Sequence, residues 1–151
     1  MPDTPNLLFI LTDQQRYDSL RCYGNDWINT PNLNALSLRS FVFKNAYVTQ
    51  PVCTPSRASI MTGLYPHQNG QIGLATWKYS MYSAKFDNAV RTLKEAGYRT
   101  GLIGKLHINP KDAFPFNFKA VSKSNFSRSN MAEYTRQARK FIGTSNQPFY
   151  L

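Results

Sequence analysis

A run of apolar residues near the start of the chain, Asn6 to Thr12, constrains the fold more than any other feature. The run reads NLLFILT and is apolar at consecutive positions instead of alternate ones. Short continuous runs of this kind are typical of strands that are buried on both faces, as in a parallel sheet. Asp13 follows directly, so we expect it at the carboxyl end of the strand, where open α/β sheets form their ligand crevices.

The remaining chain alternates between helical and strand patterns. We predict helices at residues 30–39, 56–62, 87–96 and 131–142. We predict further strands at residues 41–48, 98–104 and 148–151, and long loops at residues 64–86 and 111–130. Thr30 and Asp87 are the predicted N-caps, and Gly63 and Gly97 are predicted to close two of the helices. This order favours an α/β fold, with a mostly parallel central sheet flanked by helices.

Length and composition bear on the number of domains and on the cellular compartment of the protein. The 151 residues suit one compact domain, and they include no apolar run of the roughly eighteen residues that a membrane span needs. The first residues also lack a secretory signal, so we expect a cytoplasmic protein without membrane contact, or a periplasmic or secreted one if a leader has been removed. Without export, Cys22 and Cys53 are expected to be free thiols.

The chain is strongly basic, with a formal net charge of +10 from 18 Lys and Arg against 8 Asp and Glu. This excess suits anionic partners such as nucleic acid, anionic polysaccharide or acidic small substrates. The basic residues are spread along the chain and form no run. That distribution argues against nucleic acid as the partner.

The stretch TQPVCTPSRASIMTG, residues 49–63, carries the clearest candidate site. Pro55 fixes the backbone ahead of a helix, so Cys53 is predicted to lie near a helix N-terminus, where unpaired N–H groups and the helix dipole favour anions. Arg57 can turn back toward the same point and offer a planar fork of donors to an oxyanion. The residues alone leave two interpretations open: a reactive cysteine beside an anion site, or a buried free cysteine near a helix cap.

The order C-T-P-S-R at residues 53–57, followed by Thr62-Gly63, resembles the signature of type I sulfatases, which is C-x-P-x-R before a helix and a T-G pair. The resemblance implies the alkaline-phosphatase-like fold of that family and the activity of a sulfuric ester hydrolase. It also implies that a maturation enzyme oxidises Cys53 to formylglycine. In the family, one hydroxyl of the hydrated aldehyde attacks sulfur, and the other expels sulfate by restoring the aldehyde.

The run LFILTDQQR at residues 8–16 is similar to the family's first strand, which ends in two metal ligands. The resemblance implies that Asp13, Gln14 and the residue-53 hydroxyl ligate a divalent cation: Ca²⁺, with Mg²⁺ or Mn²⁺ as alternatives. The family commonly has two aspartates here, so Gln14 is a departure. A Gln amide oxygen still ligates a hard cation, but it removes one negative charge from the site. Taken alone, this pair would more often begin a loop.

The segment G-K-L-H at residues 104–107 follows a predicted strand and is similar to the family's G-K-x-H segment. The resemblance implies that Lys105 contacts the nucleophile and the sulfate. It also implies that His107 orients the hydrated aldehyde or helps to remove its proton, a task that suits an imidazole. By itself, a Lys-x-His at a strand end is more often a solvated edge.

Two longer runs, SRASIMTGLYPHQNG and AGYRTGLIGKLH, look closest to the heparan N-sulfatase (N-sulfoglucosamine sulfohydrolase) branch. This resemblance implies a sulfated small molecule or a sulfated sugar, including a sulfamate, as the substrate. His67, in PHQNG, is the other histidine. We expect it to pack or hydrogen-bond within its loop, with recognition of the leaving group as the weaker alternative.

The family's catalytic domain is longer than this chain, so residues 1–151 are predicted to be its N-terminal portion, with further metal ligands downstream. Ca²⁺ takes about six to eight oxygens, more than Asp13, Gln14 and residue 53 supply. We therefore expect the 151 residues alone to bind Ca²⁺ weakly and to lack turnover. We also expect an unpaired sheet edge near Phe149. The oligomeric state is left open.

The sequence leaves two alternatives to a sulfatase open. The first is a phosphonate or phosphate ester hydrolase of the same superfamily, because that branch can also carry an Asp-Gln pair at its metal. The second is a basic module that binds polyanions without catalysis. Such a module would lose affinity steeply with salt and would tolerate replacement of Cys53 by Ala.

Overall fold

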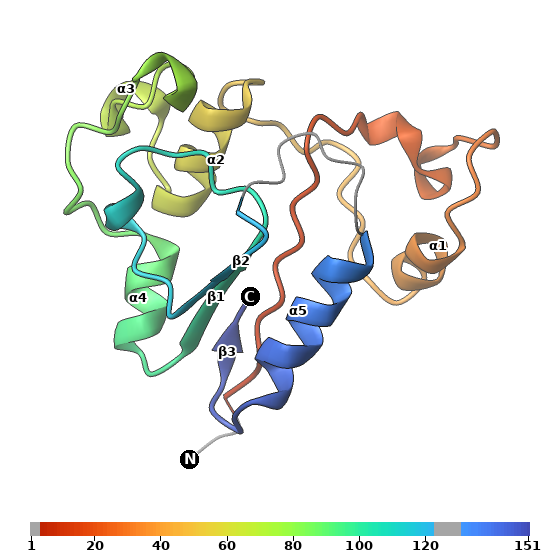
Figure 1. Cartoon of the computed structure of the whole chain (residues 1–151). Coiled ribbons are helices and arrows are strands. Elements are labelled where there is room, and N and C mark those ends of the chain that lie inside the picture. Colours follow the sequence, from red (N-terminus) through yellow and green to blue (C-terminus); the bar gives the residue numbers. More distant parts are fainter. Residues whose placement is uncertain (1–3, 123–130) are drawn as a thin grey trace. The chain divides into compact units, whose positions relative to one another are not determined.

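A computed structural model describes residues 4–122 and 131–151 of the chain. The chain divides into two compact units, which are coloured along the sequence in Figure 1. The larger unit is formed by Met1–Ile10 and Thr49–Leu151, and the smaller unit by Leu11–Val48. Among the described residues, none of the helices has the length and apolar character to cross a bilayer.

The larger unit contains a three-stranded parallel sheet. Its strands are β1 (Arg99–Ile103), β2 (Phe118–Ala120) and β3 (Phe149–Tyr150), in the order β2-β1-β3. The register pairs Gly101 with Phe118 and Thr100 with Tyr150. Leu7 joins the other edge of β3 through a parallel bridge to Tyr150. The described pairings of this unit are all parallel, as the sequence predicts.

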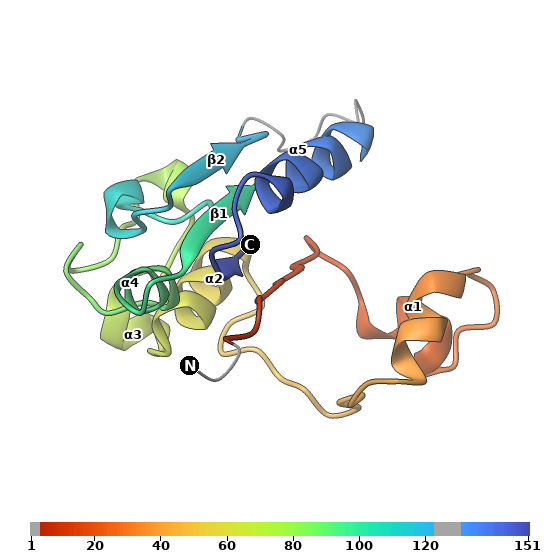
Figure 2. The ribbon, with the colours of Figure 1, turned by 90° about the horizontal axis from the view of Figure 1, so that it is seen from below.

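Helices α4 (Ala89–Glu95) and α5 (Met131–Gly143) pack against β1 (Figures 1 and 2). Helix α2 (Cys53–Thr62) packs on α4, and α3 (Pro66–Asn69) packs on α2. Two 3₁₀ turns lie at Ala75–Trp77 and Lys111–Ala113. Successive strand residues point to opposite faces. Phe149 of β3 contacts Phe141 of α5, whereas Tyr150 joins the core that α2 and α4 help to form. The sheet therefore has helices on both faces.

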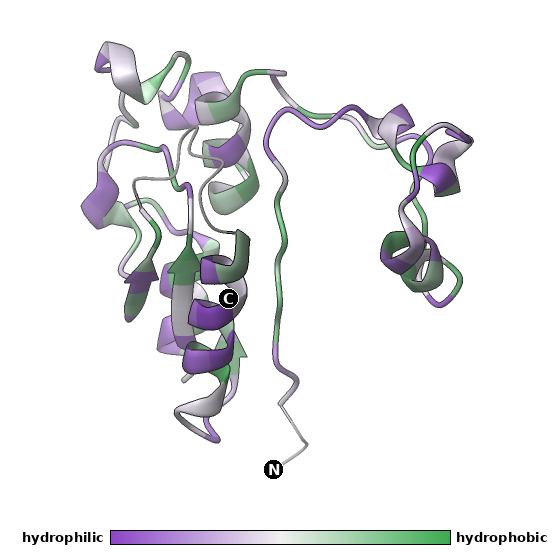
Figure 3. Ribbon diagram, turned by 45° about the vertical axis from the view of Figure 1, so that its right-hand side comes forward, coloured by the Kyte–Doolittle hydropathy of each residue, from purple (hydrophilic) through white to green (hydrophobic). Residues whose placement is uncertain are grey.

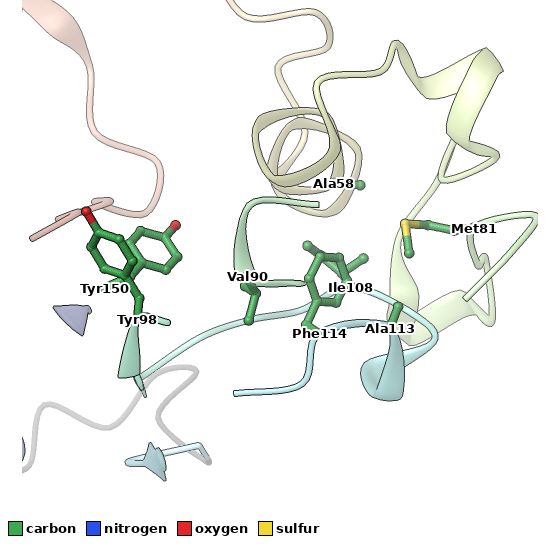
Figure 4. Packing of buried hydrophobic residues seen from close by; sticks show 8 residues of the cluster. All are labelled: Ala58, Met81, Val90, Tyr98, Ile108, Ala113, Phe114 and Tyr150. Carbon is green, nitrogen blue, oxygen red and sulfur yellow. The ribbon is translucent and has the colours of Figure 1, made fainter. Parts of the chain in front are cut away.

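The core of the larger unit lies on the α2 and α4 side of the sheet (Figure 4). Its buried side chains are Ala58, Met81, Val90, Tyr98, Ile108, Ala113, Phe114 and Tyr150. Ile108 and Phe114 are fully buried, and each contributes about 1.5–3 kcal/mol by leaving water. Both residues follow β1 in the chain. Their burial anchors the segment that contains His107.

Gly101 allows α5 to approach the sheet closely. A Cβ built on this glycine would lie 2.9 Å from the ring of Phe141 and 2.8 Å from the side chain of Leu151. Phe141 is 1% exposed, and the Arg99 guanidinium lies over its ring, 4.0 Å from the centroid. Phe118 also contacts the Phe141 ring. The packing of α5 on β1 therefore requires glycine, which has no side chain, at position 101.

The N-terminal apolar run differs from its prediction. Figure 3 shows this extended segment as strongly hydrophobic, yet Leu8, Phe9 and Ile10 are 60%, 42% and 77% exposed. Backbone hydrogen bonds join Leu7 and Phe9 to the chain at β3, on one edge only. Among the described residues of the larger unit, no element covers the run, so burial on both faces is wrong here. The same bonds pair the edge near Phe149, which we expected to be unpaired.

Helix boundaries follow the local sequence signals with small shifts. α2 begins at Cys53, three residues before its predicted start, and ends before Gly63 as predicted. The cap of α4 is Asn88 and not Asp87, because the Asn88 side chain accepts the Arg91 N–H at 3.1 Å. α5 ends one residue beyond its prediction.

The strand predictions in this unit are confirmed for β1 and β3, but β2 was missed. β2 interrupts the loop predicted at residues 111–130, of which 123–130 lie outside the described residues. Its three residues form a strand by pairing with β1, which no local pattern indicates. The loop predicted at residues 64–86 is confirmed, apart from α3 and one 3₁₀ turn.

The smaller unit contains α1 (Pro31–Ser37) and two 3₁₀ turns, Tyr17–Ser19 and Arg21–Tyr23. Pro31 begins α1 as predicted, although the Thr30 side chain makes no capping hydrogen bond and the helix stops short of residue 39. The strand predicted at residues 41–48 is wrong, because this segment forms no strand and exposes its aromatic side chains. Among the described residues of this unit, no strand pairs with it, and β-propensity alone does not make a strand.

Candidate active site

The candidate site lies at the N-terminus of α2 in the larger unit. Val52 is extended, with φ −129° and ψ 136°, and Cys53 is the first residue of the helix. The Val52 position offers no side-chain cap to the first N–H groups. These groups and the helix dipole favour an anion at this end. Cys53 is a half-buried free thiol.

The segment after β1 brings a histidine to this helix end. Gly104 turns the chain with a φ of 102°, in the left-handed region that suits glycine. His107 has a φ of 54°, a conformation that costs free energy for an L residue. Its Nδ1 lies 3.5 Å from Cys53 Sγ and 3.3 Å from Thr54 Oγ1. Two motifs that are 54 residues apart therefore meet in space.

Arg57 joins the same two segments. Its Nη1 donates a hydrogen bond to the Lys105 carbonyl oxygen at 2.8 Å, and the residue is only 7% exposed. Hydrogen bonds from a charged donor are stronger than neutral ones. A positive charge is thus fixed between α2 and the segment of Lys105 and His107. Lys105 itself is half-buried.

The structure also identifies supporting residues that the sequence analysis missed. Asn109 donates from Nδ2 to the carbonyl oxygens of Ala75 and Tyr79, both at 3.1 Å. Its backbone N–H donates to Oε1 of the buried Gln71, also at 3.1 Å. Thr54 Oγ1 accepts the Ala75 N–H at 3.3 Å. These bonds tie the loop between α3 and α4 to both halves of the site.

His67 is exposed and lies in α3. Its ring stacks on Tyr65, with centroids 5.7 Å apart and planes at 13°. The Tyr65 N–H donates to Gln68 Oε1 at 2.9 Å, which closes the same turn. These contacts suit the local packing role that we expected first. Recognition of a leaving group by His67 stays a prediction.

Asp13 and Gln14 belong to the smaller unit, and both are exposed. Gln14 has a φ of 54°, so the chain turns sharply directly after Asp13. Cys53 belongs to the larger unit, so a metal site shared by this pair and Cys53 stays a prediction. Within residues 4–122 and 131–151, no three His, Cys, Asp or Glu side chains form a metal-ligating cluster. Amide, hydroxyl or substrate oxygens would have to contribute to such a site.

Comparison with known proteins decides the family. The sulfatase family profile matches residues 5–151. The chain belongs to the sulfatase family. The match includes the C-T-P-S-R and G-K-L-H segments, which meet in the structure. The family resemblance that the sequence motifs indicated is thereby confirmed.

The sulfatase chain is similar to characterised proteins whose names describe the hydrolysis of sulfate or sulfamate groups. It is 40% identical to human N-sulphoglucosamine sulphohydrolase over 152 residues, which cover 97% of the chain and 30% of that protein. It is 38% identical to an arylsulfatase of Clostridium perfringens over 111 residues, which cover 71% of the chain and 22% of that protein. The chain therefore spans less than a third of the length of these relatives.

Solved structures agree with the fold of this sulfatase chain. The putative sulfatase yidJ of Bacteroides fragilis superposes with a TM-score of 0.65 at 36% identity, over 70% of this chain and 24% of its own. A protein solved with its substrate D-glucosamine-2-N,6-O-disulfate superposes with a TM-score of 0.79 at 26% identity, over 97% of this chain and 33% of its own. The predicted sulfatase fold of the alkaline-phosphatase-like type is confirmed for the part that the chain covers.

Proposed function

We propose that this chain contributes the nucleophile to an enzyme that hydrolyses sulfate ester or sulfamate bonds, with residue 53 acting after oxidation of Cys53 to formylglycine. The contact between Cys53 Sγ and His107 Nδ1, at 3.5 Å, carries the proposal. It joins the two sulfatase motifs at one helix N-terminus, where an anion is favoured. The family match and the names of the relatives support the reaction class.

The neighbouring residues have chemistry that suits this reaction. Formylglycine supplies a geminal diol, which can attack sulfur and later release sulfate, whereas a thiol lacks the second hydroxyl. His107 Nδ1 faces residue 53 and is placed to accept its proton. The first N–H groups of α2 and the fixed charge of Arg57 favour negative charge on the sulfuryl oxygens. Lys105 adds a second positive charge from the same segment as His107.

A divalent cation fits the other predicted donors. The Asp13 carboxylate, the Gln14 amide and the residue-53 hydroxyl all offer oxygen, which Ca²⁺, Mg²⁺ and Mn²⁺ prefer. We propose Ca²⁺, because a neutral Gln in the set suits a cation that accepts mixed oxygen ligands. When bound, the cation would offset the negative charge of the sulfate group.

We further propose a sulfated sugar as the substrate class. The human relative is named for N-sulphoglucosamine, and one solved neighbour holds a glucosamine disulfate as its substrate. The net charge of +10 suits an anionic sugar. The C-T-P-S-R segment would also be recognised by a formylglycine-generating maturation enzyme.

Turnover by the full-length protein tests the proposed function. The substrates are N-sulfoglucosamine, an aryl sulfate and an aryl phosphonate, and the variants are Cys53→Ala and Cys22→Ala. We expect sulfamate or sulfate hydrolysis that falls about a thousandfold or more in Cys53→Ala and persists in Cys22→Ala, which removes the other cysteine. Preferential phosphonate hydrolysis would favour the related phosphonate hydrolases. Salt-sensitive polyanion binding without turnover would favour the non-catalytic module.

A further inference from the structure

The 75–79 turn carries two side chains of complementary chemistry beside the candidate site. Ala75–Trp77 forms a 3₁₀ turn, and Lys78 closes it by donating its N–H to the Ala75 carbonyl oxygen at 3.1 Å. Trp77 is 72% exposed, and Lys78 is exposed as well. Neither residue takes part in the chemistry proposed above. An indole ring and a positive charge are therefore adjacent in the chain, and both are exposed in the part that the structure describes.

Both halves of the candidate site hold this turn. Thr54, which follows the predicted nucleophile in the chain, accepts the Ala75 N–H at 3.3 Å through Oγ1. Asn109, two residues after the histidine of the site, donates from Nδ2 to the carbonyl oxygens of Ala75 and Tyr79, both at 3.1 Å. A 3₁₀ turn rises about 2 Å per residue, so Trp77 begins about 4 Å beyond Ala75. A ligand larger than sulfate, bound at residue 53, is therefore within reach of the 75–79 turn.

The conformation of the turn is fixed by its neighbours. Lys78 has a φ of 66°, a left-handed conformation that costs free energy for an L residue and persists only where the surroundings determine it. The Tyr79 ring lies against the backbone of Gly73, where a Cβ would clash with it. The buried Gln71 donates from Nε2 to the Gly73 carbonyl oxygen at 2.9 Å. A ligand on this turn would therefore have little backbone left to order, which favours binding.

We infer that Trp77 and Lys78 bind a sugar ring that carries a second negative group, beside the sulfate or sulfamate that reacts at residue 53. One face of a sugar ring presents C–H groups, which leave water when they stack on an indole. The Lys78 ammonium pairs with a sulfate or carboxylate on the same sugar. A lysine here favours an anionic ligand over an apolar protein surface, because burial of an unpaired ammonium costs free energy. The inference rests on the proposed function and adds a selection for sugars that carry more than one anionic group.

Sulfate release by the full-length enzyme tests the assignment, with glucosamine sulfated at N2 and O6 as the substrate. We expect Trp77→Ala to raise KM about tenfold, and Trp77→Phe, which keeps an aromatic face, to raise it less than about threefold. Lys78→Gln should raise KM about three- to fivefold, whereas Lys78→Arg, which keeps the charge, should stay within about twofold. The kcat of these variants should change less than about twofold, because the side chains bind the sugar and not the reacting sulfur.

Trp27→Ala and Lys85→Gln are the matched controls. Trp27 is the other tryptophan of the 151 residues and is 95% exposed, and Lys85 is another exposed lysine of the loop between α3 and α4. Both variants should keep the wild-type KM. The effect of Lys78→Gln should shrink between about 50 mM and 500 mM salt, because salt screens an exposed ion pair. An unchanged KM in Trp77→Ala, equal changes in the controls, or losses confined to kcat would overturn the inference.

Binding to the Cys53→Ala form of the full-length protein separates this inference from the proposed function. Calorimetry with the same disulfated sugar needs no turnover, and Trp77→Ala in that background should raise the Kd about tenfold. If the wild-type enzyme shows no turnover on sulfated substrates, the proposed function fails while this titration still decides whether the turn binds the sugar. No binding of the sugar, or a Kd that Trp77→Ala leaves unchanged, would overturn the inference.

Discussion

Arg57 shows how one side chain can serve both stability and the site. Its guanidinium is nearly buried and donates to the Lys105 carbonyl, so it holds the segment of Lys105 and His107 against α2. A lysine would keep the charge but lose the planar fork of donors. The position therefore requires arginine for its geometry as well as for its charge.

We predict that Arg57→Lys lowers the free energy of unfolding by about 1.5–3 kcal/mol, the range for hydrogen bonds from charged donors. Urea unfolding followed by circular dichroism measures the change. Arg136→Lys on α5 is the matched control, because the Arg136 side chain is 74% exposed and pairs with Glu133 at the surface. The control should change stability by less than about 1 kcal/mol. Equal effects at the two positions would contradict the structural role of Arg57.

Tyr150 gives a prediction for high pH. Burial raises the pKa of the Tyr150 phenol above its usual value of 10.0. The unfolded chain, with the lower pKa, loses this proton first as the pH rises, so the stability contribution is full below about pH 10 and declines above it. We expect Tyr150→Phe to weaken this decline and to have little effect near neutral pH, where the hydroxyl makes only a long contact to Met61 Sδ at 3.8 Å.

Urea unfolding at a series of pH values from neutral to alkaline checks this expectation. Tyr82→Phe is the control, since Tyr82 is 72% exposed. If the two variants showed the same alkaline decline as the wild-type chain, ionisation of Tyr150 would not be part of it.

At the scale of elements, α5 and β1 depend on a close approach at Gly101. A Cβ there would meet the Phe141 ring and Leu151 at less than 3 Å. We predict that Gly101→Ala destabilises the larger unit by about 1–3 kcal/mol through overpacking. Gly143→Ala at the end of α5 meets nothing within 4 Å and should be neutral or slightly stabilising. Thermal unfolding compares them, and equal midpoints would contradict the packing of α5 on β1.

The elements differ in how far local sequence determines them. α2, α4 and α5 carry glycines, caps or helical spacing in their own residues, so their predictions need only small corrections. β2 exists because Gly101 and its neighbours offer a pairing edge, and residues 41–48 lack such an edge among the described residues of their unit. Strand formation depends on partners that are distant in sequence, which explains both errors.

In the candidate site, too, some residues could be predicted from local sequence and others depend on the fold. Cys53, Arg57, Lys105 and His107 were predicted from motifs, because these residue types carry the chemistry. Their contact required the fold to bring together segments 54 residues apart. Thr54 and Asn109 were missed, since their roles depend on the course of the loop between α3 and α4. No spacing in the sequence describes that course.

At the scale of the whole molecule, the chain covers 30% of the human relative that it matches. The predicted metal donors within the 151 residues come from three residues and offer at most four oxygens, against about six to eight in a Ca²⁺ shell. We predict that the isolated chain binds Ca²⁺ with a Kd weaker than about 1 mM by titration calorimetry. Asp26→Asn serves as the control for Asp13→Asn, since both residues are exposed aspartates of the smaller unit. Micromolar binding that Asp13→Asn abolishes and Asp26→Asn preserves would contradict this expectation.

The central claim is that residue 53 becomes an aldehyde, and a peptide mass spectrum across residues 49–63 tests it most directly. The protein should come from cells in which a known sulfatase is matured, so that the maturation enzyme is present. We predict a peptide about 18 Da lighter than its cysteine form, because CH₂SH is replaced by CHO. A peptide found only at the unmodified thiol mass, while the known sulfatase in the same cells is converted, would contradict the account.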